Sequence, residues 1–220
     1  MAAGDSRRTG AHDGELPPLL RHGGRALAAT VAGREGAARR HYDSALAAGV
    51  PAVALVEIAR MAHLLGGFPR AIQGLKALGD ALAARRLAPP RDPEPARRAR
   101  PSDRARGLRL FRRIYGPSSR AVLARLDAVA PGFSGWVVED AYGRVLARPG
   151  LAARERELLT VAALAALRCP LQLESHVRGA LRLGATPREV TAMVRAIGHD
   201  PTRAASSESR AILRSTRAPR

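Results

Sequence analysis

The chain has 220 residues, of which 46% are hydrophobic and 3% aromatic, and a formal net charge of +18. The hydrophobic share is normal for a folded protein, and the length suffices for one large domain or two small ones. Because aromatic residues are scarce, Ala, Leu and Val must build the core, which favours packed helices over sheets. The single cysteine, Cys169, excludes an internal disulfide framework.

The positive charge does not by itself indicate a nucleic-acid-binding protein. Lys76 is the only lysine among 37 basic residues, and this arginine bias beside abundant Ala, Gly and Pro is typical of GC-rich coding. The arginines concentrate in polar segments at the two ends and in the middle of the chain, where solvated tails and linkers are expected. We therefore expect no nucleic-acid partner. Weak, salt-sensitive polyanion binding by the middle segment stays an alternative.

The sequence predicts no targeting or membrane-spanning segment. Residues 1–14 are polar, lack the apolar core of a signal peptide, and are predicted to be a disordered leader. No continuous apolar run reaches the roughly 20 residues that a membrane span needs. These features predict a cytoplasmic protein that does not contact a membrane.

Two helical units are predicted along the chain. Residues 15–84 form the first unit, because Ala, Leu and Val recur there at spacings of three and four. Residues 85–107 are predicted to be an interdomain linker rich in Arg and Pro, residues 108–200 the second unit, and residues 201–220 a polar tail. No segment alternates with period two for long enough to form a strand. The predicted fold class is all-α.

Local signals mark helix starts in the second unit. Thr186, Pro187 and Glu189 have the spacing of a capping box with proline at the first helical position. Ser118 or Ser119 is expected to cap an earlier helix whose apolar residues share one stripe. Both signals predict helices that bury one face.

An internal repeat relates the two units. The segments starting at His41 and His176 both read H-x3-A-L-x2-G, and each is followed by a proline and an apolar helix. The matching helix makes duplication a better account than chance. We expect two tandem copies, and we expect the first to be structural because only His41 of the site residues recurs there.

Two stretches of the second unit, Gly135–Leu151 and Arg156–Ala180, resemble the carboxymuconolactone decarboxylase family. Residues 37–79 resemble a diverged copy of the same unit. The resemblance implies an all-α, alkyl hydroperoxidase D-like fold of antiparallel helical hairpins. It also implies assembly into homo-trimers or hexamers.

The resemblance and the helical spacing together give a candidate site. Cys169, Gln172 and His176 are spaced i, i+3, i+7, so one helix face carries all three, and Glu157 lies on the preceding helix. A hairpin could bring the Glu157 carboxylate to the imidazole, an arrangement typical of acid–base catalysis. The related hydroperoxidase signature has a Cys-x-x-Cys pair, but here Gln172 stands in place of the second cysteine. Without that thiol, no internal disulfide can form.

The leading hypothesis is a cofactor-free decarboxylase or lactone-processing enzyme acting on a small carboxylated lactone. His176 would deliver a proton to the dienolate left by CO₂ loss and Glu157 would orient it. Gln172 would contact the substrate, and the arginines able to bind its carboxylates are Arg144, Arg148 and Arg178. No histidine pair has metal-binding spacing, so no metal or other cofactor is expected.

Two further hypotheses stay open. A thiol-dependent peroxidase would use Cys169 with an external resolving thiol. A non-catalytic oligomeric scaffold would have Glu157 and His176 far apart or sealed off.

Overall fold

The computed structural model describes residues 16–94 and 101–198. Its α-helices are α1 (Pro18–Val31), α2 (Glu35–Ala47), α3 (Ala52–Ala84), α4 (Pro101–Tyr115), α5 (Ser119–Val129), α6 (Phe133–Trp136), α7 (Ala153–Leu167), α8 (Pro170–Arg182) and α9 (Pro187–Gly198). A short 3-10 helix, η1 (Gly116–Ser118), precedes α5, and a π-helix, η2 (Val137–Leu146), continues α6. These two ranges contain no strand, which confirms the all-α fold class.

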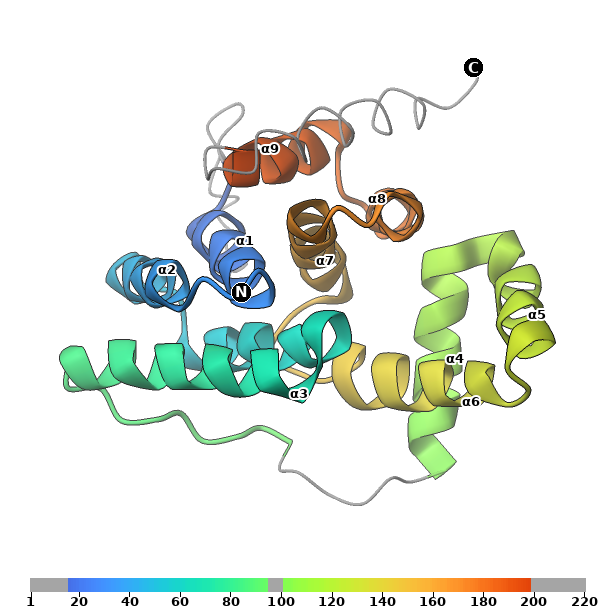
Figure 1. Cartoon of the computed structure of the whole chain (residues 1–220), viewed down its shortest axis with the longest axis horizontal. Coiled ribbons are helices and arrows are strands. Elements are labelled where there is room, and N and C mark those ends of the chain that lie inside the picture. Colours follow the sequence, from blue (N-terminus) through green and yellow to red (C-terminus); the bar gives the residue numbers. More distant parts are fainter. Residues whose placement is uncertain (1–15, 95–100, 199–220) are drawn as a thin grey trace, which may run out of the picture.

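The two predicted units share one core. In Figure 1, α7 lies near the centre, with α1, α8 and α9 around it. Helix α1 of the first unit packs against α2 and α3, and also against α7 and α9 of the second. Two adjacent glycines allow this close packing: a Cβ on Gly23 would lie 2.5 Å from the Ile58 side chain, and one on Gly24 would lie 2.7 Å from that of Met193. The buried apolar residues of both units form a single cluster.

Helix α3 bends sharply at its middle. Gly67 has φ 76°, a left-handed conformation that favours glycine, and Pro69 follows it. By length and composition, α3 is the one helix among the described residues that could cross a membrane, with 39% of the relevant window buried. The sequence-based search for an apolar run had not singled it out, because Arg, His and Gly interrupt the apolar residues. Core helices of soluble proteins pass the same test.

The segment predicted to be a linker is partly helical. Residues 85–94 have no regular secondary structure, but α4 begins at Pro101, inside the predicted 85–107 range. The expectation that nothing packs there is wrong for residues 102–107, because Asp103 and Gly107 are buried. Proline is tolerated in a first helical turn, so a proline-rich composition alone did not exclude this helix. The predicted leader (1–14) and tail (201–220) lie outside the described residues.

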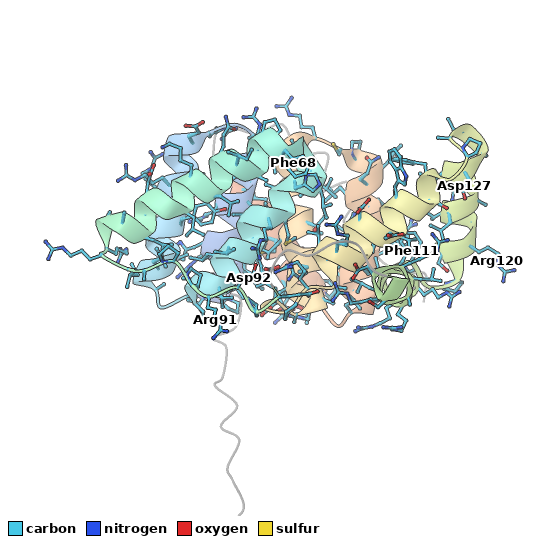
Figure 2. All side chains as sticks on the ribbon, turned by 90° about the horizontal axis from the view of Figure 1, so that it is seen from below. Phe68, Arg91, Asp92, Phe111, Arg120 and Asp127 are labelled. Carbon is cyan, nitrogen blue, oxygen red and sulfur yellow. The ribbon has the colours of Figure 1, made fainter. Side chains whose placement is uncertain are left out.

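Helix α4 and η2 cross with their backbones in contact. A Cβ on Gly107 would overlap the Val138 carbonyl oxygen, and one on Gly143 would overlap the Asp103 carbonyl oxygen. Phe111 packs here against Tyr142, with ring centroids 4.8 Å apart; Figure 2 shows Phe111 beneath η2. This glycine-mediated crossing fixes Tyr142, the neighbour of Gly143, beside the candidate site.

The two predicted helix starts have different outcomes. The capping box at α9 is confirmed: the Glu189 N–H donates to Thr186 Oγ1 and the Thr186 N–H donates to the Glu189 carboxylate. Ser118 is the residue before α5, but its side chain makes no capping hydrogen bond. Contrary to the prediction of a buried stripe, α5 has no buried residue, and Val129 is 89% exposed. This helix lies at the edge of the molecule, where little packs against it (Figure 1).

Candidate active site

The α7–α8 hairpin brings the predicted acid and imidazole together. Helix α7 ends at Leu167, and Arg168 adopts a left-handed conformation with φ 56° that reverses the chain before α8 begins at Pro170. In the resulting hairpin, Glu157 Oε2 lies 2.9 Å from His176 Nδ1. The two side chains converge as the sequence predicts.

The Glu157 carboxylate is buried behind the imidazole, with 1% of its side chain exposed. A Cβ on Gly179 would lie 2.6 Å from Glu157 Oε2 and 2.7 Å from Ile114 Cγ2, so only glycine leaves room for the carboxylate on this side. The other oxygen, Oε1, is also buried and has no hydrogen-bond partner. Its lone pairs are desolvated, which strengthens the attraction of the carboxylate for a proton on His176.

The environment of His176 favours its charged form. Burial alone lowers the pKa of the imidazole, but the negative charge of Glu157 and the hydrogen bond to it together outweigh that effect and raise the pKa above its usual 6.5. With Glu157 ionised, Nδ1 donates its proton to the carboxylate, so Nε2 is the nitrogen left to exchange a proton with a ligand. His176 is thereby suited to donate a proton near neutral pH.

His176 opens onto a cavity of about 310 Å³. The walls come from α3, η2, α7 and α8, and the lining is largely apolar. The lining residues are Met61, Leu64, Leu65, Ala141, Tyr142, Leu146, Thr160, Leu164, Leu167, Cys169, Gln172 and His176. Glu157 is absent from this set, so it acts on a ligand only through His176.

Cys169 and Gln172 line the same cavity as His176, which confirms the predicted shared helix face. The Cys169 thiol is half-buried and lies 3.7 Å from the Leu167 carbonyl oxygen. Gln172 is exposed, one turn before His176 on α8. The structure therefore brings together four of the predicted site residues.

The three arginines predicted to hold substrate carboxylates lie elsewhere. Arg144 pairs with Asp140 and Arg178 with Glu174, each on the surface of its own helix. Arg148 Nε lies 3.0 Å from Glu57 Oε1 in a separate ion-pair cluster. None of the three lines the His176 cavity, so the structure does not bring the predicted carboxylate clamp together with His176. Arg144 and Arg178 have their partners four residues away on their own helices, whereas the Arg148 partner Glu57 is distant in the sequence.

The cluster around Arg148 joins the two predicted units. Glu57 of α3 is fully buried and pairs with Arg148 and with Arg156 of α7, each at 3.0 Å. Asp92, which Figure 2 shows below α3, accepts from Arg60 and Arg148. Desolvation lowers the pKa of the Arg156 guanidinium despite the charge of Glu57. This buried network is structural, since none of its members reaches the cavity.

Sequence reasoning missed a polar group and a whole wall of the cavity. Tyr142 was not among the predicted site residues, yet it lines the cavity, and its hydroxyl donates to the Tyr115 hydroxyl at 3.1 Å. Burial raises the pKa of both phenols, so both stay protonated. The Tyr115 ring meets the His176 ring edge-on, with centroids 6.5 Å apart. Tyr142 belongs to the stretch Gly135–Leu151 that resembles the family, and this resemblance was the one sequence feature that could have indicated a role for it in the site.

The missed wall comes from the first unit. Met61, Leu64 and Leu65 of α3 line the cavity, although the first unit was expected only to be structural. Their apolar character gave no functional signal in the sequence. Within residues 16–94 and 101–198, no group of three His, Cys, Asp or Glu side chains could hold a metal ion.

Two comparisons with known proteins bear on this site. Residues 134–211 match the model of the carboxymuconolactone decarboxylase family. The matched region includes Cys169, Gln172, His176 and Glu157, so it contains the acid and the imidazole of the site. It does not include the α3 wall.

A curated relative extends the similarity. The chain is 31% identical over 130 residues to "Peroxisomal protein 2" of Schizosaccharomyces pombe (strain 972 / ATCC 24843). The aligned region covers 57% of this chain and 58% of the relative. The chain thus spans somewhat more than half of the relative's length.

Proposed function

We propose that this protein is a cofactor-free acid–base enzyme of the carboxymuconolactone decarboxylase type, with His176 as the proton carrier. The observation that carries the proposal is the 2.9 Å contact between Glu157 Oε2 and His176 Nδ1, placed where His176 faces a largely apolar cavity of about 310 Å³. That volume is at the small end of ligand pockets and suits a monocyclic lactone or a similar carbonyl compound.

The proposed step is protonation of a carbanion. The substrate loses its carboxylate as CO₂, and the electron pair of the broken C–C bond is delocalised into the lactone carbonyl as a dienolate. His176 Nε2–H then forms the new C–H bond and is left neutral, still bound through Nδ1 to Glu157. The raised pKa of His176 favours its protonated form before the step. Solvent reprotonates it between turnovers.

The lining of the cavity replaces the carboxylate clamp that the sequence predicted. A carboxylate enclosed by Leu64, Leu146 and Leu164 loses hydration, whereas CO₂ and a delocalised dienolate need less of it. Gln172 at the same cavity can donate to the carbonyl oxygen on which charge develops. The site therefore favours decarboxylation without a cationic residue in contact with the leaving group.

The test compares two histidines of the chain. Purified protein is incubated with γ-carboxymuconolactone and close analogues, and CO₂ release is measured for wild type, His176→Ala and His41→Ala. We expect turnover that falls by about 10²–10⁴-fold in His176→Ala, the range for loss of a general acid, and is kept in His41→Ala. No CO₂ release by wild type, or equal rates in all three, would contradict the proposal.

A thiol peroxidase is the second candidate, favoured by the place of Cys169 on the wall of the same cavity. The thiolate would attack the hydroperoxide, break the O–O bond and release an alcohol, leaving a sulfenic acid. Two external thiols would then reduce it with loss of water. Hydroperoxide consumption that needs added thiol and disappears in Cys169→Ser, with no CO₂ release from the lactones, would select this function.

Other predicted properties remain proposals. We propose that α1–α3 and α7–α9 arose by duplication, which is supported by matching turns. Gly33 and Arg168 both have positive φ between the first two helices of each set, and Gly49 and Gly184 do so between the last two. Assembly into homo-trimers or hexamers and a cytoplasmic location are likewise proposed. The non-catalytic scaffold is disfavoured by the closeness of Glu157 to His176.

A further inference from the structure

A second cavity, of about 320 Å³, lies on the far side of Leu146. Its floor is apolar and its polar lining consists of arginines only. The lining residues are Arg106, Arg109, Leu110, Arg113, Leu146, Ala147, Arg148, Leu151 and Ala153. Four cations around an apolar floor form a combination that the proposed reaction does not use.

Helix α4 presents three of these arginines on one face. Arg106, Arg109 and Arg113 are spaced by three and four residues, so their side chains project from the same side of the helix. Like charges at this spacing destabilise a helix unless an anion offsets them. Arg109 and Arg113 are exposed and make no hydrogen bond or ion pair with any residue in the described part of the chain.

The other two arginines are fixed in place by protein contacts. Arg106 donates through Nε and Nη2 to the Gly143 carbonyl oxygen and through Nη1 to Glu94. Arg148 uses Nε and Nη2 to bind Glu57 and Asp92, which leaves Nη1 without a partner in that cluster. The carboxylates of Glu57, Asp92, Glu94 and Asp103 pair with four arginines, and the unbalanced charge of the cavity therefore comes from Arg109 and Arg113. Those four arginines are Arg60, Arg106, Arg148 and Arg156.

We propose that this arginine cavity binds a small amphipathic anion: a carboxylate or phosphate head group on a short apolar chain. The planar guanidinium groups of Arg109 and Arg113 can donate two hydrogen bonds each to such a head group. The chain would lie on Leu110, Leu146 and Leu151. The volume limits the ligand to a small molecule.

This site is separate from the proposed catalytic one. Leu146 is the one residue that lines both cavities, and no arginine lines the cavity that holds His176. An anion bound here is therefore out of reach of the imidazole. The proposal does not depend on the function proposed for His176.

The test is calorimetric titration of the full chain at about 0.15 M salt, near physiological ionic strength. The probes are hexyl phosphate and hexanoate, with hexanol and inorganic phosphate for comparison. The double variant Arg109→Gln/Arg113→Gln removes the two unpaired cations. Its control, Arg112→Gln/Arg120→Gln, removes the same charge from exposed positions outside the cavity; Figure 2 shows Arg120 pointing away from the body of the protein on α5.

We expect saturable binding of at least one amphipathic anion with a stoichiometry of one. The cavity variant should weaken that binding by about tenfold or more, since it removes the charge-assisted hydrogen bonds to the head group. The control variant should stay within about twofold. Preference for hexyl phosphate or for hexanoate identifies the head group.

Three results would overturn the proposal. The first is no saturable binding of either amphipathic anion at millimolar concentration. The second is an equal loss in both double variants, which would indicate general attraction to a chain of net charge +18. The third is inorganic phosphate binding as tightly as hexyl phosphate, which would show that the apolar floor does not contribute to binding. Thermal unfolding of both variants checks that each is folded, and all four substituted arginines are exposed.

Discussion

The two three-helix sets, α1–α3 and α7–α9, have similar helices and turns but different ionisable residues at equivalent positions. His176 on α8 has the buried Glu157 carboxylate as its partner, whereas the position equivalent to Glu157 in the first set is His22. The Nδ1 atom of His22 is buried without a partner, and burial, followed by the charges of Arg21 and Arg25, lowers its pKa. The first set therefore has an imidazole whose pKa is lowered at the position where the second set has the Glu157 carboxylate.

The two sets therefore contribute to the cavity in different ways. The first set still contributes to the cavity, because Met61, Leu64 and Leu65 form one of its walls. One set supplies the proton carrier and the other supplies an apolar wall. One three-helix set can thus differ from the other at the site positions and still form a wall of the cavity. Four predictions test this division of roles.

The largest effect should come from the ion pair that joins the sets. In Glu57→Gln, Arg156 stays buried without its counter-charge, so we expect a loss of about 3–5 kcal/mol in the free energy of unfolding. Chemical denaturation measures it. The control, Asp80→Asn, removes a partner of Lys76 at an exposed position and should leave stability unchanged. Similar effects of the two changes would show that the buried cluster does not hold the sets together.

The next largest effect concerns the room made for Glu157. Gly179→Ala would place a Cβ 2.6 Å from the carboxylate, and we expect a loss of about 1–3 kcal/mol. The equivalent residue in the first set is Ser44, whose hydroxyl donates to the Arg40 carbonyl oxygen in an exposed position. Ser44→Ala should change stability by less than about 0.5 kcal/mol. Thermal unfolding of both variants measures the two changes. A Gly179→Ala variant as stable as wild type would show that the carboxylate does not need the room that glycine leaves.

Converting the Glu157 carboxylate into a neutral amide is expected to have a smaller effect, which is a change in the pKa of His176. In Glu157→Gln the two influences that raise the pKa of His176 are lost and burial remains, so the pKa should fall below its usual 6.5. An NMR titration of the histidine ring measures the change. A pKa that stays raised in this variant would show that another group charges the imidazole.

The pair of Glu157 and His176 also makes the free energy of unfolding depend on pH. Because the pKa of folded His176 is raised, the stabilisation is fully present below the pKa of the unfolded histidine and is lost as pH rises through the folded pKa. Glu157→Gln should lack this component of the pH dependence. His41→Asn serves as the control and should leave it in place.

The smallest effect concerns the first turn of each set. Gly33 has φ 75° and Arg168 has φ 56°, so the second set places an arginine in a conformation that favours glycine. We expect Arg168→Gly to stabilise the protein by up to about 1 kcal/mol, the strain relieved less the entropy that glycine loses. Gly33→Ala should destabilise it. Melting temperatures decide both, and a fall in Arg168→Gly would contradict this account.

Part of the site could be predicted from sequence because helical geometry fixes it. Cys169, Gln172 and His176 share a face at any i, i+3, i+7 spacing, and a short hairpin constrains where Glu157 can lie. The arginines could not be placed in this way. Arg148 reaches Glu57, a partner distant in the sequence that only the fold brings near. Arg144 and Arg178 pair with carboxylates four residues earlier on their own helices, and only the fold shows that these side chains lie outside the cavity.

The sequence by itself determined the all-α class and the α9 capping box, because both depend on local spacing along helices. The pairing of Glu157 with His176 was predicted from the family resemblance together with helical spacing, because the two residues lie on consecutive helices. Tertiary structure alone decided that both helix sets share one core, that α4 starts inside the proline-rich segment, and that α3 closes the cavity. These features depend on contacts between residues far apart in the chain. Apolar side chains such as Leu64 and Leu65 fit many partners, so their sequence pattern does not specify which surface they cover.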